Sequence, residues 1–184
     1  MLDGAQRHTL KRRQVAGLTL IELLLGLAVA AVLMGVALPS FDQAMQLARL
    51  RGAADNLQAT LRHGHMESVK RGRALSISLR VNAAGDWCFG ASESGACDCF
   101  VPAACSVDGV ERVTRGEEYR GIGMTPSVSN NRFSFQPKRM TVTSGSVLFT
   151  TPAGKQLRVV ASGLGRVRVC SPTGPAQVSG YPAC

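Results

Sequence analysis

Three arginines near the C-terminus have types and spacing suited to binding phosphate groups. Arg158 lies in one predicted strand, and Arg166 and Arg168 lie in the next, within Gly165-Arg166-Val167-Arg168. Successive side chains of a strand point to opposite faces, so Arg166 and Arg168 share one face and the intervening valines share the other. A guanidinium group is planar and can bind two phosphate oxygens at once. The spacing therefore indicates a surface that binds a polyanion.

The turn between these two strands decides how closely the arginines are grouped. If Ala161 and Gly165 flank a three-residue turn, Arg158 faces Arg168 across the hairpin. Like charges directly opposite each other destabilise a sheet. Such an arrangement is easier to explain if a phosphate backbone binds to that face.

Charge is segregated along the chain, whose formal net charge is +9. From Tyr119 to Cys184 there is no Asp or Glu, and the basic residues are Arg120, Arg132, Lys138, Arg139, Lys155, Arg158, Arg166 and Arg168. Lys138 and Arg139 follow Gln136-Pro137 in a predicted turn and could extend the arginine surface. Strand proteins place some cations on exposed faces. That tendency does not explain a long segment without any Asp or Glu. Such a segment indicates binding to a polyanion, either nucleic acid or acidic lipid or glycan.

Catalysis and metal binding have little support in the residue pattern. His63 and Glu67 are four apart on a predicted helix and could share a face, but a metal site needs more ligands than these two. The sequence has no HExxH pattern, no nucleophile–base pair and no glycine-rich phosphate loop. We expect a protein that is not an enzyme and that needs no cofactor or metal.

The six cysteines are expected to form disulfides. Cys88, Cys97, Cys99 and Cys105 lack a CxxC pair, and oxidised pairs are typical of domains outside the cytoplasm. Those four allow three pairings, which the sequence leaves open. A bridge between Cys170 and Cys184 would close a small terminal loop, which stabilises a fold by about 3 kcal/mol on chain-entropy reasoning.

An apolar run near the N-terminus gives the chain its organisation. Residues 18–38 contain one charged side chain, Glu22, and a helix of that length covers roughly 30 Å, the thickness of a bilayer core. The basic cluster Lys11-Arg12-Arg13 precedes the run, and positive flanks remain in the cytoplasm. This predicts a single membrane span with the rest of the chain beyond the inner membrane. The carboxylate of Glu22 would need a partner there.

The segment Gly17-Leu18-Thr19-Leu20-Ile21-Glu22-Leu23 resembles the prepilin peptidase site of type IV pilins and type II secretion pseudopilins. By this resemblance residues 1–17 are a basic leader that the peptidase removes after Gly17, and Leu18, in place of the usual Phe, becomes the methylated N-terminus. Glu22 matches the acidic residue used in filament assembly. A cut after Gly17 would create an ammonium group about one helical turn from Glu22. The alternative is a plain signal anchor.

The remaining chain predicts an α+β, type IV pilin-like fold. A long helix begins with the transmembrane segment 18–38 and continues as an amphipathic segment, 39–72. It packs on a globular head, 73–184, formed by two small antiparallel sheets or one strongly bent sheet. The expected strands are 74–81, 87–89, 121–128, 132–136, 146–151, 155–161 and 165–170, with a loop-rich insert at about 90–119.

The long helix, the late strands and the GRxR motif together resemble the FimT/GspH branch of minor pilins. This resemblance implies that Arg166 and Arg168 bind double-stranded DNA, independent of sequence, for uptake in natural transformation. It also implies other major and minor pilins as partners, with the head first in the periplasm and later in a cell-surface pilus. The alternative is a GspH-like pseudopilin or pilin that only initiates or caps a pilus or a type II secretion pseudopilus.

Overall fold

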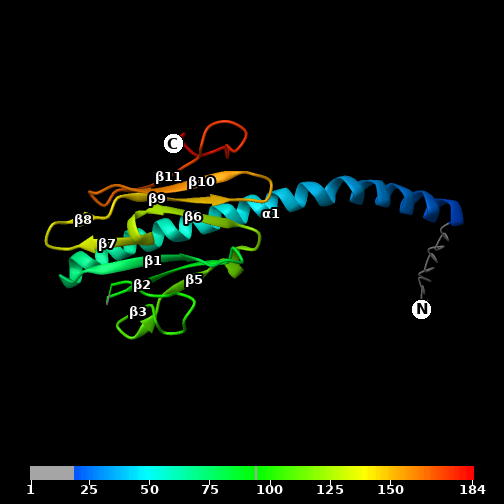
Figure 1. Ribbon diagram of the computed structural model, residues 1–184. Coiled ribbons are helices and arrows are strands. Elements are labelled where there is room, and N and C mark those ends of the chain that lie inside the picture. The colour runs from blue at the N-terminus through cyan, green and yellow to red at the C-terminus, as the bar shows by residue number, and fades with distance from the viewer. Residues whose placement is uncertain (1–18, 94) are drawn as a thin grey trace, which may run out of the picture. The chain divides into compact units, whose positions relative to one another are not determined.

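The protein is described here by a computed structural model that covers residues 19–93 and 95–184, with residues 36–40 described by their backbone only. The leader 1–17 and the predicted processing site, Gly17 and Leu18, lie outside the described residues. The chain divides into two units, Met1–Ser40 and Phe41–Cys184. A single helix, α1 (Leu20–Arg71), runs through both, which agrees with the long helix predicted from the sequence (Figure 1).

The first unit contains the start of α1. The backbone N–H of Glu22 donates to the hydroxyl of Thr19 at 3.3 Å, which caps the first turn of the helix. The described side chains between Leu20 and Met34 are apolar or small apart from Glu22, and most are exposed. The predicted membrane span, 18–38, falls partly outside the described residues; within the part described, no helix is long and apolar enough to cross a membrane.

The second unit contains two antiparallel sheets. The five-stranded sheet has the order β5 (Val113–Arg115), β2 (Trp87–Ser92), β1 (Leu75–Val81), β7 (Arg132–Gln136) and β8 (Thr141–Val142). The four-stranded sheet has the order β11 (Val167–Cys170), β10 (Gln156–Ala161), β9 (Gly145–Thr150) and β6 (Gly123–Val128). A separate pair joins β3 (Ser106–Val107) to β4 (Val110–Glu111), and the short 3-10 helices are η1 (Gly116–Tyr119) and η2 (Ser129–Asn131).

One hydrophobic core joins the second half of α1 to both sheets. Leu50, Leu57 and Leu61 recur at helical spacing and are fully buried. They pack with the inward side chains of the five-stranded sheet, such as Phe133, and of the four-stranded sheet, such as Phe149. Figure 1 shows α1 running between the ribbons of the two sheets. The helix therefore positions both sheets.

The seven expected strands are all present, and the loop-rich insert also contains short strands that were not expected. Strand β2 continues to Ser92 instead of ending at Phe89, and β5 pairs with it between Cys88–Gly90 and Val113–Arg115. Strands β3, β4 and β8 were not predicted. Each has two residues, too few to show the alternation on which a strand prediction depends.

The insert covers the outer face of β1 and β2 with a small second core of cystines. The disulfides are Cys88–Cys99 and Cys97–Cys105, which settles the pairing that the sequence left open. All four sulfur-bearing residues are buried together, and the amide of Cys97 donates to the hydroxyl of Ser78 on β1 at 3.0 Å. The tail has the expected pair, Cys170–Cys184.

Candidate functional site

The hairpin of β10 and β11 carries the three arginines, in a register that differs from the predicted one. Ala161 pairs with Val167, Val160 with Arg168, and Arg158 with Cys170. The prediction that Arg158 faces Arg168 is therefore wrong. The turn is two residues longer than assumed, which moves Arg168 to a diagonal position relative to Arg158 and avoids directly opposed like charges.

The shift of two residues preserves which face each side chain occupies. Leu157, Val159, Val167 and Val169 are buried against the core, as the alternation predicted. Arg168 is exposed and Arg158, on the same outer face, is half-buried, while Arg166 is exposed in the loop just before β11. Within residues 19–93 and 95–184 none of these three guanidinium groups takes part in a hydrogen bond or ion pair; the ion pairs there are centred on Arg71 and Arg115.

Lys138 and Arg139 lie in the turn between β7 and β8, as predicted, and are exposed. Strand β8 is joined to the β10–β11 loop because the amide of Val142 donates to the carbonyl of Gly163 at 3.0 Å. The β7–β8 turn is thus connected through one hydrogen bond to the loop that precedes Arg166. The five cations predicted from the sequence therefore lie in two turns, which carry Lys138, Arg139 and Arg166, and in two strands, β10 with Arg158 and β11 with Arg168.

The loop between β10 and β11 is held by its own hydrogen bonds. The amide of Ser162 donates to the carbonyl of Arg166, and the amide of Gly165 donates to the carbonyl of Ser162, both at 2.9 Å. The amide of Arg166 also donates to the hydroxyl of Ser162 at 3.2 Å. Leu164, at the apex, is 85% exposed. These bonds fix the backbone that carries Arg166.

Helix α1 supports the same segment with side chains that sequence reasoning missed. The amide of Gln58 and the guanidinium of Arg62 both donate to the carbonyl of Val167, at 3.4 Å and 3.2 Å. Two turns of helix bring His65 against the backbone of Gly165. Arg62 is exposed and adds a further cation beside β11. From the sequence alone, Gln58, Arg62 and His65 would be assigned to a solvent-exposed helix face. Their contacts could not be predicted because residues 165–167 lie about a hundred positions further along the chain.

Gly165→Ala is expected to destabilise the head more than Gly154→Ala. Both glycines have φ +79, where a side chain costs about 1–3 kcal/mol, but a Cβ at Gly154 meets open space. A Cβ at Gly165 would overlap the ring of His65, which adds about 1–3 kcal/mol of overpacking. Thermal melts of the two variants should differ accordingly, and His65→Ala should remove the difference. Equal losses of stability would show that His65 does not restrict Gly165.

Acidic groups gather around Arg71, at the end of α1. Arg71 forms ion pairs with Glu67, at 2.5 Å, with Glu93, at 3.2 Å, and with Asp108 of the insert. Its hydrogen bonds lower the pKa of Glu67 and of Asp108, and these two carboxylates raise the pKa of Arg71. One guanidinium group thus binds three carboxylates at this end of α1, whereas Arg158, Arg166 and Arg168 form no ion pair within the described residues.

Two family models match the chain. The model described as "Type II transport protein GspH" matches residues 53–165, which include the second half of α1 and every strand of the two sheets except β11. The model described as "Prokaryotic N-terminal methylation motif" matches residues 12–38. No curated protein sequence matches at a significant level.

Solved structures of low sequence identity have a similar fold. The minor pilin FimU of Pseudomonas aeruginosa is 20% identical, with a TM-score of 0.48 over 72% of this chain and 92% of that chain. The minor pseudopilin EpsH from the type 2 secretion system of Vibrio cholerae is 13% identical, with a TM-score of 0.46 over 68% of this chain and 99% of that chain.

Proposed function

Because this chain belongs to the GspH family of minor pilins and pseudopilins, we propose that its head displays the arginine surface at a pilus and binds extracellular DNA there for natural transformation. The arginine surface is defined as Arg158, Arg166 and Arg168, with Lys138 and Arg139 at its edge. One observation carries the proposal. Arg158 and Arg168 share the outer face of the β10–β11 hairpin and Arg166 is exposed at the end of the loop just before β11, all within an acid-free segment, and their guanidinium groups have no partner in the described part of the chain.

The proposed contacts are with backbone phosphates of double-stranded DNA and do not depend on sequence. Arg158 and Arg168 project from a strand face whose other positions are Gln156, Val160 and Cys170, and the hairpin offers no helix to enter the major groove. The exposed apolar side chain at the apex, Leu164, is no aromatic platform for unstacked bases. The charge and the spacing of the arginines therefore favour weak binding to any DNA duplex, with an affinity that falls as the salt concentration rises.

Processing and location are part of the same proposal. Prepilin peptidase removes residues 1–17, Leu18 is methylated, and the precursor waits in the inner membrane with its head in the periplasm. The match of the N-terminal methylation motif over residues 12–38 supports this sequence of events. Assembly with other pilins then covers the exposed apolar side chains of the first unit, among them Leu20, Ile21 and Val32. Glu22 acts in this assembly step.

A second candidate function is purely structural. The same exposed apolar helix start favours a minor pilin or GspH-like pseudopilin that initiates or caps a pilus or pseudopilus without binding DNA. The arginine surface would then contact a neighbouring subunit. The two functions differ in one measurable property, the affinity of the isolated head for DNA.

Gel-shift titrations of the segment from Phe41 to Cys184 on duplexes of unrelated sequence test the proposal. This segment contains the whole hydrophobic core and all three disulfides. Contact with about three to five phosphates predicts micromolar affinity and a log–log salt slope near −3 to −4.5. The affinity should be the same for each duplex. No binding at low salt would leave the structural role as the function.

A further inference from the structure

Four apolar side chains are exposed at one end of the second unit. They are Leu164 at the apex of the β10–β11 loop, Met140 in the β7–β8 turn, and Met66 and Val69 in the last turns of α1, and they are between 42% and 85% exposed. Figure 1 shows this turn, this loop and the end of α1 at the same end of the unit. We refer to these four residues as the apolar end patch.

Contacts around His65 of α1 hold the apolar end patch together. The ring of His65 packs against the backbone of Gly165, the residue next to Leu164. His65 also lines a small depression together with Val69 and Met140. In addition, the hydrogen bond from β8 to the β10–β11 loop joins the two connections that carry the apex residues. The four side chains therefore belong to one surface formed by three elements, and are more than scattered exposed residues.

The apolar end patch is surrounded by positive charge. Four exposed cations accompany it: Lys138 and Arg139 in the β7–β8 turn, Arg166 in the β10–β11 loop and Arg62 on α1. Arg62 lies one helical turn before Met66, so the two share a face of the helix. Each of the three elements thus presents an apolar and a basic side chain together.

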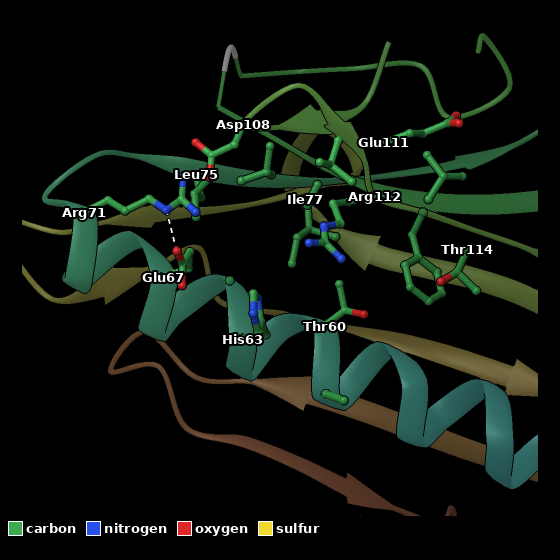
Figure 2. Close-up of a pocket in the computed structure, with 17 residues that line it drawn as sticks. Thr60, His63, Glu67, Arg71, Leu75, Ile77, Asp108, Glu111, Arg112 and Thr114 are labelled. Carbon is green, nitrogen blue, oxygen red and sulfur yellow. Dashed lines mark hydrogen bonds and ion pairs between the residues drawn. The ribbon is translucent and has the colours of Figure 1, made fainter. Parts of the chain in front are cut away.

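Carboxylates are directed away from this surface. Residues 119–184 contain no Asp or Glu. On α1, Glu67 lies on the opposite face from His65, because two residues turn a helix by about 200°. Figure 2 shows Glu67 with Arg71 and Asp108 in the pocket between α1 and the insert, where both carboxylates pair with Arg71. The surface around the apolar end patch is therefore positive, and its partner should be anionic.

The combination of apolar loop apexes and cations fits a lipid surface better than DNA or a protein. A phosphate backbone offers nothing to an exposed leucine or methionine. A stable protein interface requires a broad and closely packed contact, whereas side chains at the apexes of two loops can enter a headgroup layer singly. An anionic membrane surface provides phosphates for the cations and hydrocarbon just beneath them.

We propose that the apolar end patch docks the head onto a membrane surface that contains anionic phospholipids. Leu164 and Met140 enter the boundary between headgroups and acyl chains, and the neighbouring guanidinium groups bind lipid phosphates. The surface shares Lys138, Arg139 and Arg166 with the arginine surface. Its apolar residues have no part in the proposed contact with DNA, so lipid docking stands or falls independently of DNA binding.

Tryptophan fluorescence tests the docking with the full chain in phosphatidylcholine nanodiscs, mixed with separate vesicles whose acyl chains are brominated. The natural tryptophan, Trp87, is buried and gives a constant background. In Leu164→Trp the added fluorescence should be quenched by phosphatidylglycerol vesicles and not by phosphatidylcholine vesicles. The matched control is Val101→Trp, at a half-exposed apolar position of the insert, which should not be quenched by either.

Vesicle flotation of the same nanodiscs measures the contribution of the natural side chains. Leu164→Ser with Met140→Ser should weaken binding to phosphatidylglycerol vesicles about tenfold or more, because two apolar side chains no longer leave water. Val101→Ser with Val110→Ser, two half-exposed valines of the insert, should bind as wild type. Both double variants should keep the DNA affinity of wild type, since neither removes a charge.

Three results would overturn lipid docking. The first is equal quenching of Leu164→Trp by the two kinds of vesicle, and the second is full vesicle binding by the Leu164/Met140 double variant. The third is wild-type flotation no greater than that of empty nanodiscs, which would leave a protein as the partner of the apolar end patch.

Discussion

Replacing Arg166 and Arg168 together with glutamine is expected to remove most of the DNA binding of the head. Arg168 is exposed on the outer face of β11, Arg166 is exposed in the loop just before it, and neither has an ion pair in the described residues, so the change costs no packing and breaks no ion pair. The log–log salt slope should flatten by about 2, because two phosphate contacts are lost. The melting temperature should stay within a few degrees of wild type.

The matched control replaces Arg73 and Arg80, which are also exposed and lie outside the four-stranded sheet, with glutamine. It changes the net charge equally. If the DNA affinity of the head depends only on its net charge, the two double variants will lose the same affinity. If the arginine surface is the contact, the control will retain most of its affinity and its full salt slope. Wild-type binding by the Arg166/Arg168 variant would contradict the assignment.

Glu22→Val is expected to abolish filament incorporation, and with it transformation, while the head keeps its fold. Glu22 lies in the first turn of α1 and in the first unit, and the whole core belongs to the second unit. A carboxylate among apolar side chains needs a positive partner, and the N-terminus created by cleavage after Gly17 would supply one. Pilus fractions probed for the protein, together with transformation frequency, measure the effect.

A charge-conserving variant separates the carboxylate from the helix cap. Thr19 caps the first turn through the backbone amide of residue 22, so that bond survives any side-chain change there. Glu22→Asp should retain part of the incorporation, and the DNA affinity of the head should be equal in both variants. Normal transformation by Glu22→Val would count against a role within a filament.

The alternation of apolar residues was enough to predict most of the fold. Strand β7, Arg132–Gln136, matches its predicted range, and the buried faces of β10 and β11 follow directly from side-chain alternation. The hairpin register was missed because it depends on the turn. The bonds between Ser162 and Arg166 lengthen the loop beyond the assumed three residues, and nothing in the residue types distinguishes the two lengths.

Contacts between segments that are far apart in the sequence could not be predicted from residue patterns. The packing of His65 on Gly165 explains why glycine precedes Arg166, yet a hundred residues separate the two positions. The insert posed the same difficulty. Its shape depends on the disulfides Cys88–Cys99 and Cys97–Cys105, which four cysteines alone do not specify.

The edge position of β11 has a mechanical consequence. If the proposed DNA contact is made, a filament that pulls on the DNA loads β11, which carries Arg168 and follows Arg166, and this strand is hydrogen-bonded to a neighbouring strand, β10, on one side only. On the other side the side chains of Gln58 and Arg62 tie the carbonyl of Val167 to α1, so part of the tension passes directly to the helix. The strand ends at Cys170, whose bond to Cys184 prevents the tail from peeling away under load. Strand β11 is thus anchored at its start by a helix and at its end by a covalent link.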